Sequence, residues 1–80
     1  MVAEKWYPRA DSGWTARAML TLRNSRIPAI RKLRVEAISI GVVLHGQVNL
    51  FYYKQLAQEL VRNELKDIPI FNEIEVLDPS

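Results

Sequence analysis

Residues 42–76 decide the fold, and they read VVLHGQVNLFYYKQLAQELVRNELKDIPIFNEIEV. Residues 42–48 alternate between two sets of side chains with period 2, which is typical of a strand that packs one face on a core. Residues 70–77 alternate in the same way. Between them lies an apolar stripe at helical spacing, made by Tyr53, Leu56, Ala57, Leu60, Val61 and Leu65. Strand, helix and strand in this order predict a crossover unit.

The helix of this unit has clear expected limits. Asn49 is a good N-cap, so the helix is predicted to begin near Leu50, and Pro69 predicts its end before the closing strand. Three aromatic residues crowd its first turn. Because successive helical residues are turned by about 100°, at least one must face solvent, and we expect this to be Tyr52. In the closing strand Asn72 falls in the inward row, where its amide would need hydrogen-bond partners.

A first helix is predicted over residues 14–23, with Asp11 or Ser12 as candidates to accept its first amide hydrogens. It should end near Asn24, because Pro28 soon forbids continuation. Pro28 instead suits the first position of one further helical turn.

Residues 1–12 include a proline and show no sustained periodicity, so they are interpreted as an extended N-terminal arm. Residues 13–80 are interpreted as the folded domain. Within it, residues 33–40 alternate as a strand and predict a hairpin with residues 42–48, turning around Ile40-Gly41. Gly46 inside a strand costs stability, which predicts a close backbone approach or a bulge.

The order helix, strand, strand, helix, strand predicts an α+β fold, αββαβ, in which a three-stranded mixed sheet carries two helices on one face. The pattern leaves open which strand is central. The positions expected to be critical for this fold are Gly41, Gly46, Leu44, Leu56, Ala57, Leu60, Asn72, Ile74 and Val76.

Composition limits the class of protein. The chain has 80 residues, enough for one small domain, and no cysteine, which excludes disulfides and thiolate metal sites. No apolar run approaches the roughly 20 residues of a membrane-spanning helix. Residues 1–5 lead into no apolar signal segment. As written, the chain is expected to stay in the compartment where it is made, unless it is a piece of a longer secreted protein.

Charge is distributed unevenly along the chain. Residues 1–34 hold eight basic and two acidic groups, a net +6, whereas residues 35–80 hold three basic and seven acidic groups, a net −4. Five of the cations fall between the end of the first helix and the start of the first strand: Arg23, Arg26, Arg31, Lys32 and Arg34. These are expected to gather at one rim. A rim of this kind would attract anionic lipid headgroups; the alternative is a solvated surface partly paired with the acidic half.

No constellation typical of an enzyme is present. His45 is the only histidine, and without a second histidine or a cysteine it predicts no metal site. Glu73 and Glu75 project from one strand face. If that strand is a neighbour of the strand that carries Arg34, an ion pair is favoured over acid–base catalysis. We expect no catalysis, no metal and no cofactor.

Four segments in this order resemble the BON domain family: Ile30-x-x-Leu33-x-Val35, GVVLHGQV at 41–48, YKQLAQE at 53–59, and residues 68–76 with their NEIEV ending. The resemblance covers residues 15–76. One departure is the spacing from Gly41 to Gly46, shorter than in the family by about one residue, which predicts a displaced turn or a bulge. The resemblance implies the αββαβ fold, no catalysis, and a place in bacterial envelope or membrane-associated proteins that contact phospholipid.

Two other function classes stay open. The outer sheet face would carry an apolar patch of Ile38, Val43 and Phe71, suited to a protein partner or to self-assembly. A nucleic-acid module of the KH type has a related layout, but it needs a Gly-x-x-Gly loop between two helices, and none exists here. The sequence therefore predicts a non-catalytic binding module, with anionic phospholipid as the first candidate partner, a protein or a second copy as the second, and nucleic acid disfavoured.

Overall fold

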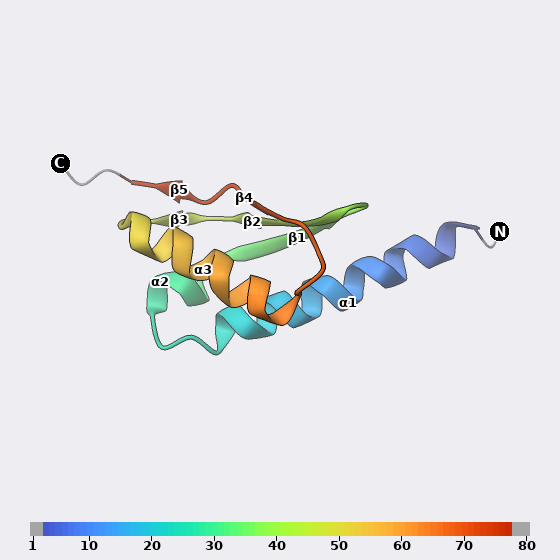
Figure 1. The fold of residues 1–80 in the computed structure, drawn as a ribbon, viewed down its shortest axis with the longest axis horizontal. Coiled ribbons are helices and arrows are strands. Elements are labelled where there is room, and N and C mark those ends of the chain that lie inside the picture. Colours follow the sequence, from blue (N-terminus) through green and yellow to red (C-terminus); the bar gives the residue numbers. More distant parts are fainter. Residues whose placement is uncertain (1–2, 78–80) are drawn as a thin grey trace.

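The computed structural model describes residues 3–77, and the side chains of residues 13–77. The expected class, α+β with a three-stranded mixed sheet, is confirmed. Along the described residues the elements follow in the order α1 (Ala3–Arg23), α2 (Pro28–Arg31), β1 (Arg34–Ile38), β2 (Gly41–His45), β3 (Gln47–Val48), α3 (Phe51–Glu64), β4 (Ile70–Asn72) and β5 (Glu75–Val76) (Figure 1).

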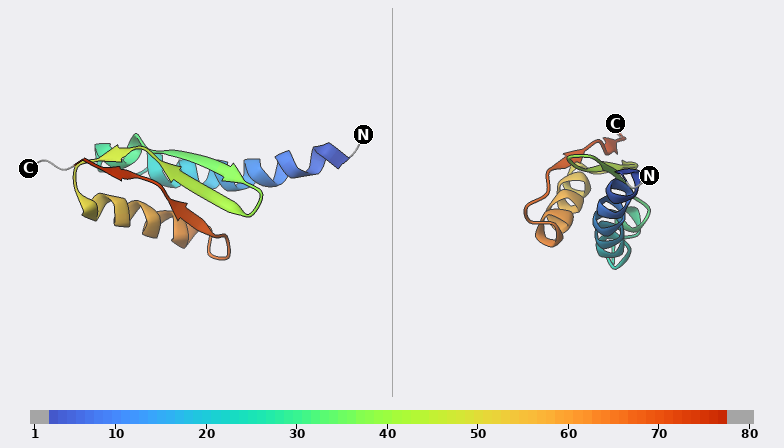
Figure 2. Two further views of the ribbon diagram at one scale, coloured as in Figure 1. Left: turned by 90° about the horizontal axis from the view of Figure 1, so that it is seen from above. Right: turned by 90° about the vertical axis from the view of Figure 1, so that its right-hand side faces the viewer.

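The central strand of the sheet is β2, which the sequence pattern left open. It pairs with β1 in antiparallel register, Arg34 opposite His45 and Ile38 opposite Gly41. It pairs with β4 in parallel register, Val43 opposite Phe71. Beyond β2, the short strands β3 and β5 form a second parallel pair, and Glu75 N donates to Gly46 O between the two pairs. The two sheets therefore continue one another along the molecule (Figure 2).

The hairpin turns at Ser39 and Ile40, one residue earlier than expected. Gly41 belongs to the strand, where it pairs with Ile38. A β-carbon built on Gly41 would lie 2.2 Å from the carbonyl oxygen of Pro69. Glycine is therefore required at this position by the approach of the chain entering β4, and not by the turn.

The predicted strand over residues 42–48 is interrupted at Gly46, between β2 and β3. Gly46 has a φ of +136°, a conformation that favours glycine. A β-carbon there would also lie 2.6 Å from Cδ2 of Leu33. The close neighbour is thus the side chain of Leu33, whereas the sequence suggested a helix backbone or a bulge.

The extended arm predicted for residues 1–12 is wrong over residues 3–12, which belong to α1. This segment contains good helix formers, namely Glu4, Lys5, Arg9 and Ala10. Once the turns of α1 that pack on the core have formed, adding further helical residues costs little free energy. The free energy gained in this way is larger than the cost of the one backbone hydrogen bond that Pro8 cannot donate. The end of α1 at Arg23 and the helical turn that starts at Pro28 are both confirmed.

Both long helices lie against one face of the sheet (Figures 1 and 2). The core between them is formed by the buried side chains of Ala18, Leu22, Ile30, Leu33, Val42, Leu44, Val48, Ala57, Val61, Leu65 and Ile74. Burial of a large apolar side chain contributes roughly 1.5–3 kcal/mol, so this cluster supplies the main stabilisation.

The apolar stripe expected on α3 is found, but burial within it is uneven. Ala57, Val61 and Leu65 are buried, whereas Leu56 and Leu60 are only half-buried. The three buried residues are spaced by four and define the centre of the inner face, so Leu56 and Leu60 fall on its flanks. The expected N-cap is also wrong: Leu50 holds that position in an extended conformation, and no side chain caps the helix.

Candidate anion-binding site

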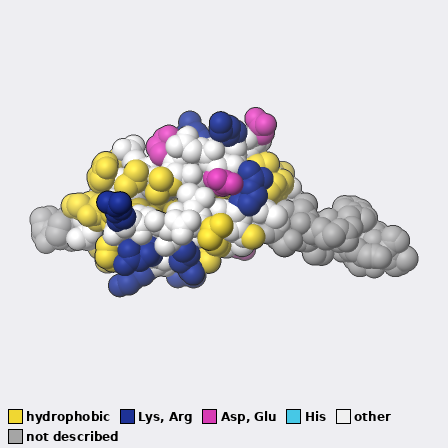
Figure 3. All heavy atoms as spheres, turned by 90° about the horizontal axis from the view of Figure 1, so that it is seen from below, with side chains coloured by type: hydrophobic (Ala, Val, Ile, Leu, Met, Phe, Trp, Pro, Cys, Tyr) yellow, Lys and Arg dark blue, Asp and Glu magenta, His cyan; other side chains and the backbone are white. Residues whose placement is uncertain are grey.

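The five predicted cations lie between the end of α1 and the start of β1, and all five are exposed. Arg23 ends α1, Arg31 ends α2, and Arg34 begins β1. Arg26 lies in the connecting loop, and Lys32 follows α2. Seen from the helix side, several Lys and Arg side chains lie at the end of the molecule opposite the start of α1, and others lie along the upper edge of this view (Figure 3). We call these five residues the basic rim.

The loop between α1 and α2, which carries Arg26, is stabilised by local hydrogen bonds. Ile27 N donates to Ser25 Oγ at 3.0 Å, and Arg31 Nη1 donates to the carbonyl oxygen of Ser25, also at 3.0 Å. Arg31 is therefore oriented by the loop and not by an acidic partner.

Within residues 13–77, the ion pairs are Arg17–Glu64 and His45–Glu36. No rim residue takes part in either. The partial pairing of the rim with the acidic half of the chain is thus not found in this part of the structure, and the rim cations face solvent.

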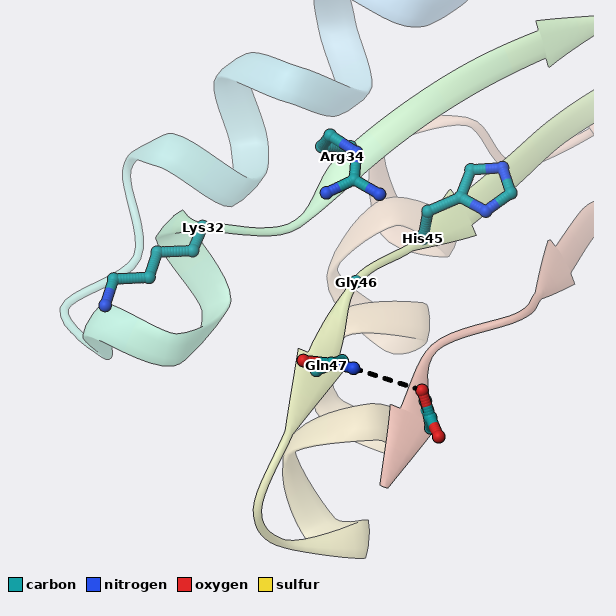
Figure 4. A pocket seen from close by; sticks show the side chains of 6 residues that line it. Lys32, Arg34, His45, Gly46 and Gln47 are labelled. Carbon is teal, nitrogen blue, oxygen red and sulfur yellow. Dashed lines mark hydrogen bonds between the residues drawn. The ribbon is translucent and has the colours of Figure 1, made fainter. Parts of the chain in front are cut away.

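Two residues of the rim line a hollow at the edge of the sheet. Its volume is about 400 Å³, and its lining comprises Lys32, Arg34, His45, Gly46, Gln47 and Glu75 (Figure 4). The antiparallel register that sets Arg34 opposite His45 creates this juxtaposition, and β3 adds Gln47. In Figure 4 the ammonium group of Lys32 extends away from the other side chains. Lys32 therefore lines the hollow with the part of the residue nearer to its backbone.

His45 is engaged on the outer sheet face. Its Nε2 lies 2.8 Å from Oε1 of Glu36, and both side chains are accessible to solvent. Because Glu36 pairs with Val43 in the ladder, this contact runs diagonally from β2 to β1.

The ion pair expected between Arg34 and Glu73 or Glu75 is wrong. The central strand β2 separates β1 from β4, and Glu75 lies in β5, which pairs with β3, so neither carboxylate is opposite Arg34 in the sheet. Glu75 instead accepts a hydrogen bond from Gln47 Nε2 at 3.2 Å. The Arg34 guanidinium therefore has no carboxylate partner among the described residues and can donate to an anion.

The predicted patch on the outer sheet face is brought together in part. Val43 and Phe71 are opposite one another in the parallel register, and Phe71 is 39% exposed. Ile38 lies on the same face, opposite Gly41. Ile40 at the hairpin tip is 60% exposed, and sequence reasoning assigned it to the turn.

The donor that the hollow offers to an anion is the Arg34 guanidinium, since Gln47 Nε2 donates to Glu75, His45 Nε2 contacts Glu36, and the Glu75 carboxylate also lines the hollow. In the described part of the chain, no group of three His, Asp or Glu side chains is placed to hold a metal ion. Among the described helices, none combines the length and apolarity needed to cross a bilayer.

Comparisons with protein-family models, with curated proteins and with solved structures find no match to this chain.

Proposed function

We propose that this chain is a non-catalytic binding module that contacts anionic phospholipid at a membrane surface through its basic rim. The observation that carries the proposal is that all five rim cations are exposed and that none is in an ion pair within residues 13–77. A cluster of unneutralised cations on one end of a small domain attracts phosphate groups.

The expected strength comes from several weak contacts. Each Lys or Arg near an anionic membrane contributes about 1 kcal/mol, and the attraction falls with salt because it acts through screened charge. Arg34 in the hollow adds directional hydrogen bonds, since a guanidinium can bind phosphate oxygens in a bidentate way.

The resemblance to BON domains supports the same proposal from the sequence. On this interpretation the elements group as αββαβ: α2 is a local turn after the first helix, and β3 and β5 continue β2 and β4 across the interruption at Gly46. The family resemblance also implies the absence of catalysis and a place near membranes.

The test is flotation of the purified chain with vesicles of neutral lipid and of neutral plus anionic lipid, at low and at physiological salt. We expect binding only to the anionic vesicles, weaker at physiological salt, and lost in the variant Arg31→Glu/Lys32→Glu. Both side chains are exposed, so the variant should remain folded.

The matched control is Arg62→Glu/Lys66→Glu, which changes the net charge equally but at the other end of α3. This control should keep most of the binding. Equal loss in both variants would show that net charge, and not the rim, drives binding. Absence of flotation under every condition would refute the lipid proposal.

A second candidate is protein interaction or self-assembly through the outer sheet face. It is favoured by one observation: Val43 and Phe71 are neighbours in the sheet, and Phe71 is exposed. An apolar patch bordered by charged residues is typical of a protein interface.

A further inference from the structure

The start of α3 exposes an unusual amount of apolar surface. Leu50, Phe51 and Tyr52 are 45%, 58% and 63% exposed. Tyr53, the next residue, turns inward and packs against the core. The rings of Tyr52 and Tyr53 lie 5.8 Å apart and tilted, so the inner ring supports the outer one.

Leu77 lies at the same end of the molecule. Its amide N donates to the carbonyl oxygen of Val48 at 2.8 Å, which places the end of β5 beside the segment that leads into α3. Leu77 is 45% exposed. We call Leu50, Phe51, Tyr52 and Leu77 the apolar tip.

Cations of the basic rim border this end. The helix α2, which carries Arg31, packs against both α3 and β3. Lys32 lines the same hollow as Gln47, only a few residues before Leu50 in the chain. Figure 3 shows hydrophobic side chains and Lys or Arg side chains together over this end.

From this juxtaposition we infer that the apolar tip inserts into the boundary between lipid headgroups and acyl chains while the rim cations contact the anionic headgroups. The inference rests on the proposed function and deepens it, because it adds an apolar contact and fixes which end of the domain faces the membrane. Aromatic and leucine side chains next to cations are the chemistry of segments that lie in a membrane interface.

A second copy of the chain fits this surface less well than a lipid surface does. A symmetric contact between two tips would bring the Arg31 and Lys32 side chains of both copies together, and like charges in an interface are unfavourable. An anionic membrane instead offers apolar and negatively charged groups side by side.

The experiment uses the fact that the chain has no cysteine, so one introduced cysteine can be labelled alone. The label is an environment-sensitive fluorophore on Tyr52→Cys, with Asn63→Cys, exposed and uncharged near the other end of α3, as the matched control. We expect a blue shift and a rise in intensity for the label at position 52 with anionic vesicles, and no change at position 63.

A second measurement uses unlabelled protein. The variant Phe51→Ser/Tyr52→Ser should bind anionic vesicles roughly tenfold more weakly than the unmodified chain, while its unfolding midpoint in urea stays the same because both side chains are exposed.

The outcomes separate this inference from the proposed function. Tip insertion would be overturned if the unmodified chain floats with vesicles, the label at position 52 shows no spectral change, and the double variant binds with unchanged affinity. The electrostatic contact would then remain supported. Loss of all flotation would overturn both. A third outcome concerns samples without vesicles. If the label at position 52 then changes its spectrum with protein concentration, and light scattering gives a doubled mass, the tip is a protein interface and insertion is also overturned.

Discussion

At the scale of single residues, Asn72 fixes the place where the closing strand is interrupted. Its Nδ2 donates to the carbonyl oxygen of Lys54 at 2.9 Å and to Gln58 Oε1 at 3.0 Å. Its Oδ1 accepts from Ile74 N at 3.2 Å. The sequence predicted that this inward amide needs partners, and the prediction is confirmed: one side chain joins α3 to the segment between β4 and β5.

We expect Asn72→Ala to lower the free energy of unfolding by about 1–3 kcal/mol, because it removes three hydrogen bonds in a half-buried setting. Urea denaturation measures the loss. The control Asn63→Ala, on the exposed side of α3, should cause no loss. Equal stability of Asn72→Ala and the unmodified chain would contradict a structural role for the amide.

Gly41 and Gly13 offer a matched pair of glycines. A β-carbon at Gly41 would lie 2.2 Å from Pro69 O, whereas nothing lies within 4 Å of one at Gly13 in α1. We expect Gly41→Ala to cost roughly 1–3 kcal/mol through displacement of β4. Gly13→Ala should instead stabilise the chain by up to about 1 kcal/mol, because alanine is the better helix former. Thermal unfolding of the two variants would reveal opposite shifts; a shift of the same sign in both would refute this account.

At the scale of elements, Arg17 joins the two long helices. Its Nη2 donates to the backbone carbonyl oxygen of Glu64 at 2.7 Å, and its Nε donates to Glu64 Oε2 at 3.1 Å. The first bond satisfies a carbonyl in the last turn of α3, where no further helical amide is available to it. The ion pair is exposed, with about half of each side chain accessible to solvent.

An exposed ion pair contributes only about 0.2–1 kcal/mol, so the bond to the carbonyl should be the larger part of this contact. We therefore expect Glu64→Gln to lower the unfolding free energy less than Arg17→Ala does. Chemical denaturation at low and high salt measures both. A larger loss for Glu64→Gln would indicate that the charge pair dominates.

At the scale of the whole molecule, the chemistry is distributed over distinct surfaces. The end formed by α2, β3 and the start of α3 carries the rim and the apolar tip. The outer sheet face near the hairpin carries Val43 and Phe71. These two surfaces can be tested independently, since a change at one leaves the other in place.

For the self-assembly alternative, Phe71→Asp should shift any dimer to the monomer mass in light scattering, since it places a charge opposite Val43 in an apolar contact. Phe71 is partly exposed, so the fold should persist. The control Phe51→Asp changes an exposed phenylalanine of the tip and should not alter the mass. An unchanged mass for Phe71→Asp would count against assembly through this face.

The sequence by itself determined the features that depend on near neighbours. Periods of two and of three to four predicted the strands and α3, Pro28 predicted the short helical turn, and the surface position of Tyr52 followed from helix geometry. The exposure of the five rim cations also followed from their charge, since an unpaired Lys or Arg is rarely buried. For the helices and strands the controlling interactions act within a turn of helix or along one strand.

Only the tertiary structure decided how distant segments meet. It made β2 the central strand, which separates β1 from β4, and it placed Arg34 and Glu75 along one hollow without an ion pair between them. It brought the exposed start of α3 to the end that carries Arg31. Strand order and helix orientation are set by the free energy of strand pairing and side-chain burial. Both depend on contacts between residues far apart in the chain, which no local pattern encodes.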